Sequence, residues 1–211
     1  MQENNKSNIL LGYSGHAYVV AEAFLMSGGE IKGYTDISEA KLNPFDLKYL
    51  GNEGDNLFTH WNEGNAFILA IGDNSIRMKI ADLVKIKGMK CQTVIHPASS
   101  ISSFTTIGEG TFIARNVSVN PFCKIGKAVI LNTASSIDHE CEISDGVHLA
   151  PGAVLAGNVR IGKGSFIGAN SVIKQGVTIG DNVVVGAGSV VLNDITKNLT
   201  VVGNPSKELK Q

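Results

Sequence analysis

The chain has 211 residues, 43% of them hydrophobic and 18% charged, so it is long enough to bury a core in one or two domains. A formal net charge of -1 provides no field that would attract nucleic acid or an anionic membrane. The longest apolar runs, such as residues 66–71, fall far short of the roughly 20 residues that a membrane helix needs. We therefore expect a cytoplasmic protein that binds neither nucleic acid nor a membrane.

The first ninety residues predict alternating strands and helices. Apolar runs predict strands at 8–12, 31–36 and 66–72, and helical spacing predicts helices at 17–27 and 75–87. The residues of the second helix expected to face the core are Ile76, Ile80, Leu83, Val84 and Ile86. This pattern is typical of a small α/β, Rossmann-like domain, which we assign to residues 1–90.

The first predicted strand ends in the turn GYSGHA, which contains Gly12 and Gly15. Such a turn opens a helix whose N-terminus can face a phosphate or pyrophosphate. The same glycines are also explained by close packing of the strand against the helix, and the turn is not the dinucleotide motif GxGxxG. Asp36 closes the second strand, where an acidic side chain meets a ribose hydroxyl or a base edge, or caps a turn.

A six-residue repeat begins at Ile95. Every sixth residue from Ile95 to Val191 is isoleucine, leucine or valine, and the residue four positions later is small or no larger than valine in all but one of these units. A unit of this kind is a short strand and a corner, and it buries its apolar face only by stacking on other units. Glycines such as Gly108 and Gly126, directly after the aliphatic residue, are expected to provide corners with positive φ.

The three cysteines of the chain, Cys91, Cys123 and Cys141, form no CxxC pair. Their odd number and spacing argue against a disulfide framework and against a thiolate zinc site. Cys123 and Cys141 are eighteen residues apart, one full coil if three units make a turn. We expect all three to be free thiols.

The hexads together with the segment ILNTASSIDHECEISDGVHLAPG, preceded by a domain with G-x-S-G-H, resemble the sialic acid O-acetyltransferase family of bacterial sugar acetyltransferases. Within it the chain is most similar to the UDP-4-amino-sugar N-acetyltransferases of bacillosamine-type pathways. The resemblance implies a left-handed parallel β-helix over residues 91–211, with the N-terminal domain holding the sugar nucleotide. Three units per coil give between five and six coils.

The resemblance also implies an activity and an assembly. The expected reaction is acetyl transfer from acetyl-CoA to the amino group of a UDP-linked 4-amino sugar, without a metal, in a homotrimer whose active sites lie between subunits. His139 is implied as the general base and Glu140 as its acidic neighbour. The residues implied for substrate are Gly12, Ser14, Gly15, His16, Asp36 and Asn132, and those implied for acetyl-CoA are His148 and Gly157.

Two features of the sequence depart from the family's pattern. The tail Val201 to Lys207 corresponds to the family's ending near the CoA, with Ser206 in place of the usual alanine. Ile37 and Ser38 follow Asp36 where family members continue with a second aspartate, so the uracil pocket is expected to be rebuilt.

The chemistry of His139 suits acetyl transfer, because imidazole accepts a proton near neutral pH and a sugar ammonium must lose one before it attacks a thioester. Glu140 contacts that ring only if the chain bends between them, since adjacent strand residues point to opposite sides. Spacing alone is equally compatible with a solvated corner histidine. His60 and His96 match nothing in the family.

Three alternatives remain at this point. A sugar O-acetyltransferase would need the same base. A zinc enzyme on the same β-helix would need a third ligand beside His139 and His148. A non-catalytic scaffold, such as an ice-binding β-helix, would need regular outward threonines, and the outward positions here are mixed.

Overall fold

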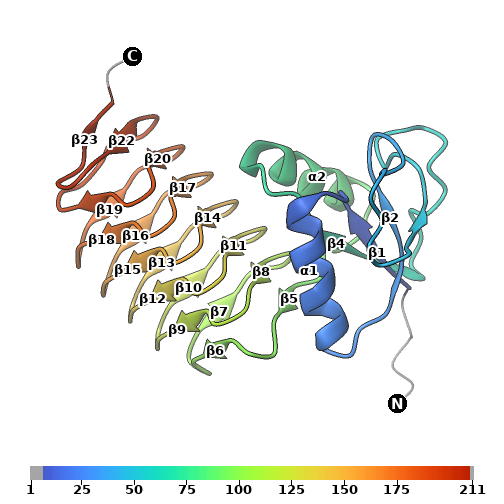
Figure 1. Cartoon of the computed structure of the whole chain (residues 1–211), viewed down its shortest axis with the longest axis horizontal. Helices are drawn as coiled ribbons and strands as arrows, with labels where there is room; N and C mark the ends of the chain where they lie inside the picture. Colours follow the sequence, from blue (N-terminus) through green and yellow to red (C-terminus); the bar gives the residue numbers. More distant parts are fainter. Residues whose placement is uncertain (1–6, 210–211) are drawn as a thin grey trace.

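The computed structural model describes residues 7–209 as an N-terminal sheet with two helices followed by a long prism of short strands (Figure 1). Residues 1–6 and 210–211, the outer ends of the two predicted domains, lie outside the described residues. The predicted fold class, a Rossmann-like domain followed by a left-handed parallel β-helix, is confirmed. The placing of the domain boundary near residue 90 stays a prediction.

The N-terminal sheet has four parallel strands in the order β3-β2-β1-β4. The strands are β1 (Ser7–Leu11), β2 (Ile31–Thr35), β3 (Lys48–Tyr49) and β4 (Asn65–Leu69), and the helices are α1 (Gly15–Met26) and α2 (Asn74–Ile86). The three predicted strands and two predicted helices are confirmed, with shifted ends. The central β1 is buried on both sides because helices cover the sheet, which explains its continuous apolar run.

The predicted inner face of α2 is partly wrong. Ile76 is half exposed and Ile86 is 79% exposed, whereas Val84 and, unexpectedly, Arg77 are buried. Val84 and Ile80 keep the inward positions expected of them, and Arg77 is buried next to the exposed Ile76. The Arg77 side chain points inward to reach backbone carbonyls of the prism, as described below.

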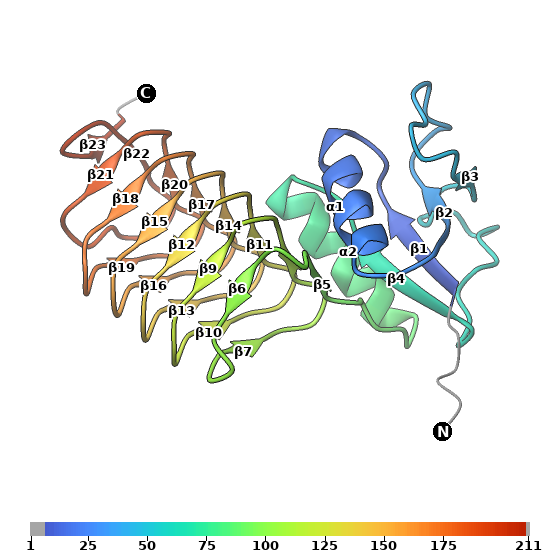
Figure 2. The ribbon, with the colours of Figure 1, turned by 60° about the horizontal axis from the view of Figure 1, so that its bottom comes forward.

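The prism has three sides, each a parallel sheet of two-residue strands (Figure 2). The first side contains β5 (Val94–Ile95), β8 (Phe112–Ile113), β11 (Ile130–Leu131), β14 (His148–Leu149), β17 (Phe166–Ile167) and β20 (Val184–Val185), extended by β22 (Thr200–Val202) and the antiparallel β23 (Lys207–Glu208). The second side contains β6 (Ser100–Ile101), β9 (Ser118–Val119), β12 (Ser136–Ile137), β15 (Val154–Leu155), β18 (Val172–Ile173) and β21 (Val190–Val191). The third side contains β7 (Thr106–Ile107), β10 (Lys124–Ile125), β13 (Glu142–Ile143), β16 (Arg160–Ile161) and β19 (Thr178–Ile179).

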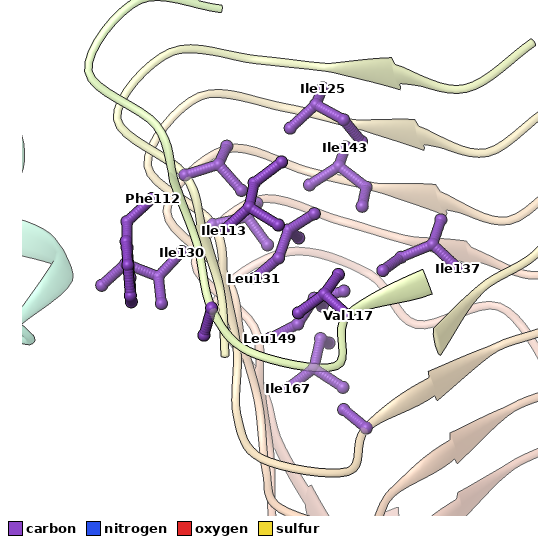
Figure 3. Close-up of a cluster of buried hydrophobic side chains, with 14 of the residues drawn as sticks. Phe112, Ile113, Val117, Ile125, Ile130, Leu131, Ile137, Ile143, Leu149 and Ile167 are labelled. Carbon is purple, nitrogen blue, oxygen red and sulfur yellow. The ribbon is translucent and has the colours of Figure 1, made fainter. Parts of the chain in front are cut away.

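Residues eighteen apart pair between neighbouring coils, as Ile130 does with His148 and Leu131 with Leu149. The aliphatic hexad positions consequently form columns inside the prism; Figure 3 shows Ile113, Leu131, Leu149 and Ile167 stacked in this way. Ile95 is an exception, 37% exposed, because it begins the first coil and has no coil beneath it.

The corner glycines have a different role from the one predicted. Positive φ recurs at every sixth residue from Gly110 to Gly188, three positions after the aliphatic residue. Gly108 and Gly126, directly after it, do not have positive φ. A Cβ on Gly108 would instead lie 2.5 Å from the carbonyl carbon of Gly126 in the next coil. These glycines are required because the backbones of stacked coils approach closely there.

The N-terminal domain lies against the first side of the prism, at the end where the coils begin (Figure 1). The His16 ring of α1 packs edge-on against Phe112 of β8, and the Asn74 amide at the start of α2 donates to the carbonyl of Gly164. Phe67 of β4 also forms a bridge with Cys91, so that the two parts share backbone contacts.

Candidate active site

His139 and Glu140 occupy the prism edge between the second and third sides, which we call the 139 edge. The His139 Nδ1 atom lies 3.0 Å from Glu140 Oε2. Neighbouring side chains meet here because Glu140 has a φ of 61°, in the left-handed region, which supplies the bend that this contact requires. The His139 side chain is 46% exposed, so its ring is accessible from outside the chain.

Two neighbours fix the position of the His139 ring. Asp138 Oδ1 accepts hydrogen bonds from the His139 backbone N–H and from the Asn120 side chain, both at 2.8 Å. The Asn120 amide and that N–H hold the pKa of the Asp138 carboxyl below its usual value. On the opposite side, a Cβ on Gly157 would lie 2.6 Å from His139 Nε2, so only glycine leaves room for the ring.

Cys123 and Cys141 lie inside the prism behind this edge. Both are buried and free, as expected, and so is Cys91. The Cys123 thiol donates to the carbonyl of Asp138 and the Cys141 thiol to that of Ala156. The hydrogen bond with Cys123 and burial both raise the pKa of Cys141. The same hydrogen bond lowers the pKa of Cys123 to about 7. Both thiols are at most 1% exposed, so neither is accessible to form an acetyl-cysteine intermediate.

A second polar cluster lies where the N-terminal domain meets the first side. His148 Nε2 lies 3.2 Å from the amide nitrogen of Asn132, and the His148 ring packs edge-on against Phe166. The His16 ring is 6.2 Å from that of His148, and its Nε2 is buried without a hydrogen-bond partner. The structure therefore brings three of the predicted residues, His16, Asn132 and His148, into one cluster.

Both histidines of this cluster are held neutral. Burial lowers the pKa of His148 to about 3, with the Arg77 and His16 charges acting in the same direction. Burial and the Arg77 charge lower the pKa of His16 to about 4. A neutral imidazole carries one N–H donor and one acceptor. The Asn132 amide already meets His148 Nε2, so His16 Nε2, rather than His148 Nε2, is the ring nitrogen left without a partner.

Arg77 joins the two parts of the chain and was not foreseen from the sequence. Its guanidinium donates to the carbonyls of Ile71 and Gly72 after β4, and to those of Ala128 and Gly146 at prism corners, at 2.8–3.2 Å. The side chain is 1% exposed, and burial lowers its pKa to about 10. The one sequence signal for its burial was that a charged residue lies among the apolar residues of α2.

The turn after β1 has the features of an anion site. Gly12 has a φ of 92°, and Ser14, the N-cap of α1, makes no side-chain capping bond. Ser14 and Gly15 are exposed, and the first turn of α1 has no acidic residue, so its backbone N–H groups are free to meet an anion. The Asp36 carboxylate accepts from the backbone N–H of Tyr13 at 2.9 Å, which ties the end of β2 to this turn.

A single chain does not bring all the predicted residues together. His139 follows β12 on the second side, whereas Asn132 and His148 belong to the first side, which faces the N-terminal domain. Gly12, Ser14, Gly15 and Asp36 lie at the turns of that domain. The predicted residues therefore form two separate groups, with His139, Glu140 and Gly157 in one and the remaining residues in the other.

Comparison with known proteins gives the family. A model described as the PglD N-terminal domain matches residues 9–84, and models for the hexapeptide repeat of succinyl-transferase and the bacterial transferase hexapeptide match residues 158–193 and 140–175. The acetyltransferase domain of PglB from Neisseria gonorrhoeae, solved with acetyl coenzyme A, is 34% identical over 97% of this chain and 100% of its own, with a TM-score of 0.90. The chain belongs to the hexapeptide-repeat sugar acetyltransferases of the bacillosamine type.

Two further solved structures agree with this family. A histidine-to-asparagine mutant of perosamine N-acetyltransferase from Caulobacter crescentus, in complex with CoA and GDP-perosamine, is 29% identical over 97% of both chains, with a TM-score of 0.92. WeeI from Acinetobacter baumannii is 28% identical over 97% of this chain and all of its own, with a TM-score of 0.86. No protein with a curated description matches the chain.

The acetyltransferase is therefore an acetyl-CoA-dependent enzyme that N-acetylates a sugar, and acetyl-CoA is its co-substrate. Between residues 7 and 209, no group of three His, Cys, Asp or Glu side chains is arranged to hold a metal ion. Over the same residues, no helix has the length and apolarity needed to cross a membrane. The cytoplasmic location stays a prediction.

Proposed function

We propose that the enzyme transfers the acetyl group of acetyl-CoA to the 4-amino group of a UDP-linked amino sugar, with His139 as general base. The neutral amine attacks the thioester carbonyl, the bond from carbon to sulfur breaks, and His139 Nε2 takes the proton that nitrogen loses. The protonated imidazole then returns that proton to the CoA thiolate. The acetyl group passes directly from CoA to the amine within one complex of enzyme and both substrates, without an acyl-enzyme.

The contact between His139 and Glu140 is the observation that carries this proposal. Glu140 accepts a hydrogen bond from Nδ1–H and so leaves Nε2 free to act as the proton acceptor. Asp138 Oδ2 is 4.0 Å from Nε2, too far for a hydrogen bond that would block it. The carboxylate of Glu140 also stabilises the imidazolium that forms during the reaction.

The proposal places the active site between subunits of a homotrimer. Its support is the separation of the two groups of residues: within one chain His139 lies on an edge away from the first side, where His148 and the N-terminal domain lie. A neighbouring copy that presents its first side to the 139 edge would join the two groups. His148 would then orient the acetyl group, and the turn from Gly12 to His16 would hold the sugar nucleotide.

The test of the chemistry is acetyl transfer to a panel of UDP-, GDP- and dTDP-linked 4-amino sugars, with wild type and His139→Ala. We expect one UDP-linked sugar to be the best acceptor. Loss of a general base is expected to lower kcat by about 10²- to 10⁴-fold with little change in thermal stability, because the ring is an exposed corner group. A near-normal rate in His139→Ala would refute the assignment of the base, and preference for another nucleotide would refute the assignment of UDP.

The test of the shared site is co-expression of two inactive variants, His139→Ala and His148→Ala, with different tags. If the two histidines of one site come from different subunits, mixed trimers contain sites with both histidines intact and recover activity. If one chain supplies both histidines, each site in a mixed trimer lacks one of them and activity stays absent.

A further inference from the structure

The corners of the prism contain two bulky residues in an unfavourable backbone conformation. Every sixth residue from Gly110 to Gly188 has positive φ, and these positions hold glycine, asparagine or alanine in all but two cases. The two exceptions are Phe122, with a φ of 64°, and Glu140, with a φ of 61°. Large side chains rarely adopt this conformation, and where they do the strain often serves a function.

Phe122 and Glu140 are neighbours on the 139 edge. They are eighteen residues apart, one coil, and the Glu140 N–H donates to the carbonyl of Pro121 at 3.1 Å. The strain at Glu140 is explained by its contact with His139. Nothing in the packing explains the strain at Phe122, because its ring is 61% exposed and contributes little to the core.

A second exposed aromatic residue lies beside Phe122. Phe104, on the coil before, is 66% exposed, and its ring centroid is 5.4 Å from that of Phe122. The two rings form an exposed apolar surface that begins one coil from the general base. We call Phe104 and Phe122 the aromatic pair.

The order of residues along the edge indicates which substrate meets this pair. The pair lies on the coils before His139, towards the end of the prism where the N-terminal domains are attached, whereas Gly157 lies on the coil after it. The N-terminal domain is the part proposed to hold the sugar nucleotide. The acceptor sugar, rather than acetyl-CoA, is therefore the substrate expected beside the pair.

We propose that Phe122, supported by Phe104, is a specificity-determining residue that forms an apolar wall of the acceptor site and selects sugars with a deoxy carbon facing it. This inference rests on the function proposed above. A methyl group packs on an aromatic ring without losing any hydrogen bond, whereas a hydroxyl at the same carbon would be separated from water and left unpaired. Discrimination by one small group in an apolar site is typically about 10- to 200-fold.

Phe122→Asn is the variant that tests this role. Asparagine is the residue at the equivalent corner of the fourth coil, Asn158, where it adopts a φ of 55°. The substitution removes the ring and relieves the backbone strain, so it should fold at least as well as the wild type. The matched control is Phe122→Tyr, which keeps the ring.

The experiment compares kcat/KM for two probes, a UDP-linked 4-amino-4,6-dideoxy sugar and the matching sugar that retains the hydroxyl at carbon 6. The wild type should prefer the dideoxy sugar by at least tenfold. Phe122→Asn should reduce that preference at least fivefold, with the KM for acetyl-CoA and the oligomeric state unchanged, and Phe122→Tyr should keep most of it.

Three results would overturn the inference: an unchanged preference in Phe122→Asn, an equal loss for both sugars together with a raised KM for acetyl-CoA, or dissociation of the variant into monomers. The last would mean that the aromatic pair is a contact between subunits. Failure of the proposed function looks different, since it would appear as an inactive wild type or an active His139→Ala.

Discussion

Replacement of Arg77 by methionine should destabilise the enzyme strongly, although the residue is far from the 139 edge. The guanidinium donates to the carbonyls of Ala128 at 2.8 Å and Gly146 at 3.0 Å, and both hydrogen bonds are buried. Methionine has a similar length but no donor, so both carbonyls lose this partner inside the junction.

The magnitude follows from these two groups. A buried carbonyl left without a partner costs about 1–3 kcal/mol, so the pair should cost about 4 kcal/mol in free energy of unfolding. For a chain of this size, each kcal/mol lowers Tm by about 2–4 °C, so Arg77→Met should lower Tm by about 8–16 °C. The Tm of Arg77→Lys should lie between those of the wild type and Arg77→Met, because an ammonium has three donors and cannot reach every carbonyl that the guanidinium meets.

The assay is thermal unfolding followed by calorimetry at fixed protein concentration. Lys85→Met is the control, because Lys85 lies on the same helix and is exposed. It should change Tm by less than about 2 °C, as surface substitutions usually do. A decrease of less than 2 °C for Arg77→Met as well would show that water replaces the guanidinium at no cost, and the role assigned to this residue would be wrong.

Two further predictions concern the histidines. Gly157→Ala should lower kcat at least tenfold, because the new Cβ would lie 2.5 Å from His139 Cε1 and would push the ring out of the position in which it meets Glu140. Tm should change little, because the ring is exposed and can move. Normal kinetics would contradict the contact between Gly157 and His139. Stability should fall as pH decreases from about 6.5 towards the folded pKa values of about 4 for His16 and about 3 for His148, because the unfolded chain binds protons there that the folded chain excludes. The slope should reach about 1.4 kcal/mol per pH unit for each histidine, and replacing both by glutamine should flatten it in thermal unfolding between pH 7.5 and 5; an unchanged slope would contradict the cause.

The hexad repeat made the prism predictable because its signal is local and repeated. A coil position that lacked an aliphatic residue would leave a gap in the column of Ile113, Leu131 and Leu149, so the pattern appears directly in the sequence. The role of the glycines was not predictable from the sequence, for the opposite reason. The close approach of Gly108 to Gly126 is a contact between coils, and a single coil does not contain it.

The sequence by itself determined the order of strands and helices and the coil repeat, because each depends on residues close together in the chain. The contact between His139 and Glu140 depended on the left-handed φ of Glu140, which the structure supplied. Only the tertiary structure decided that Arg77 is buried between the two parts, that His16 and His148 face each other, and that Phe122 shares an edge with His139. These relations arise from stacking eighteen-residue coils and packing a separate domain on one side, and both bring together residues whose spacing in the sequence carries no signal.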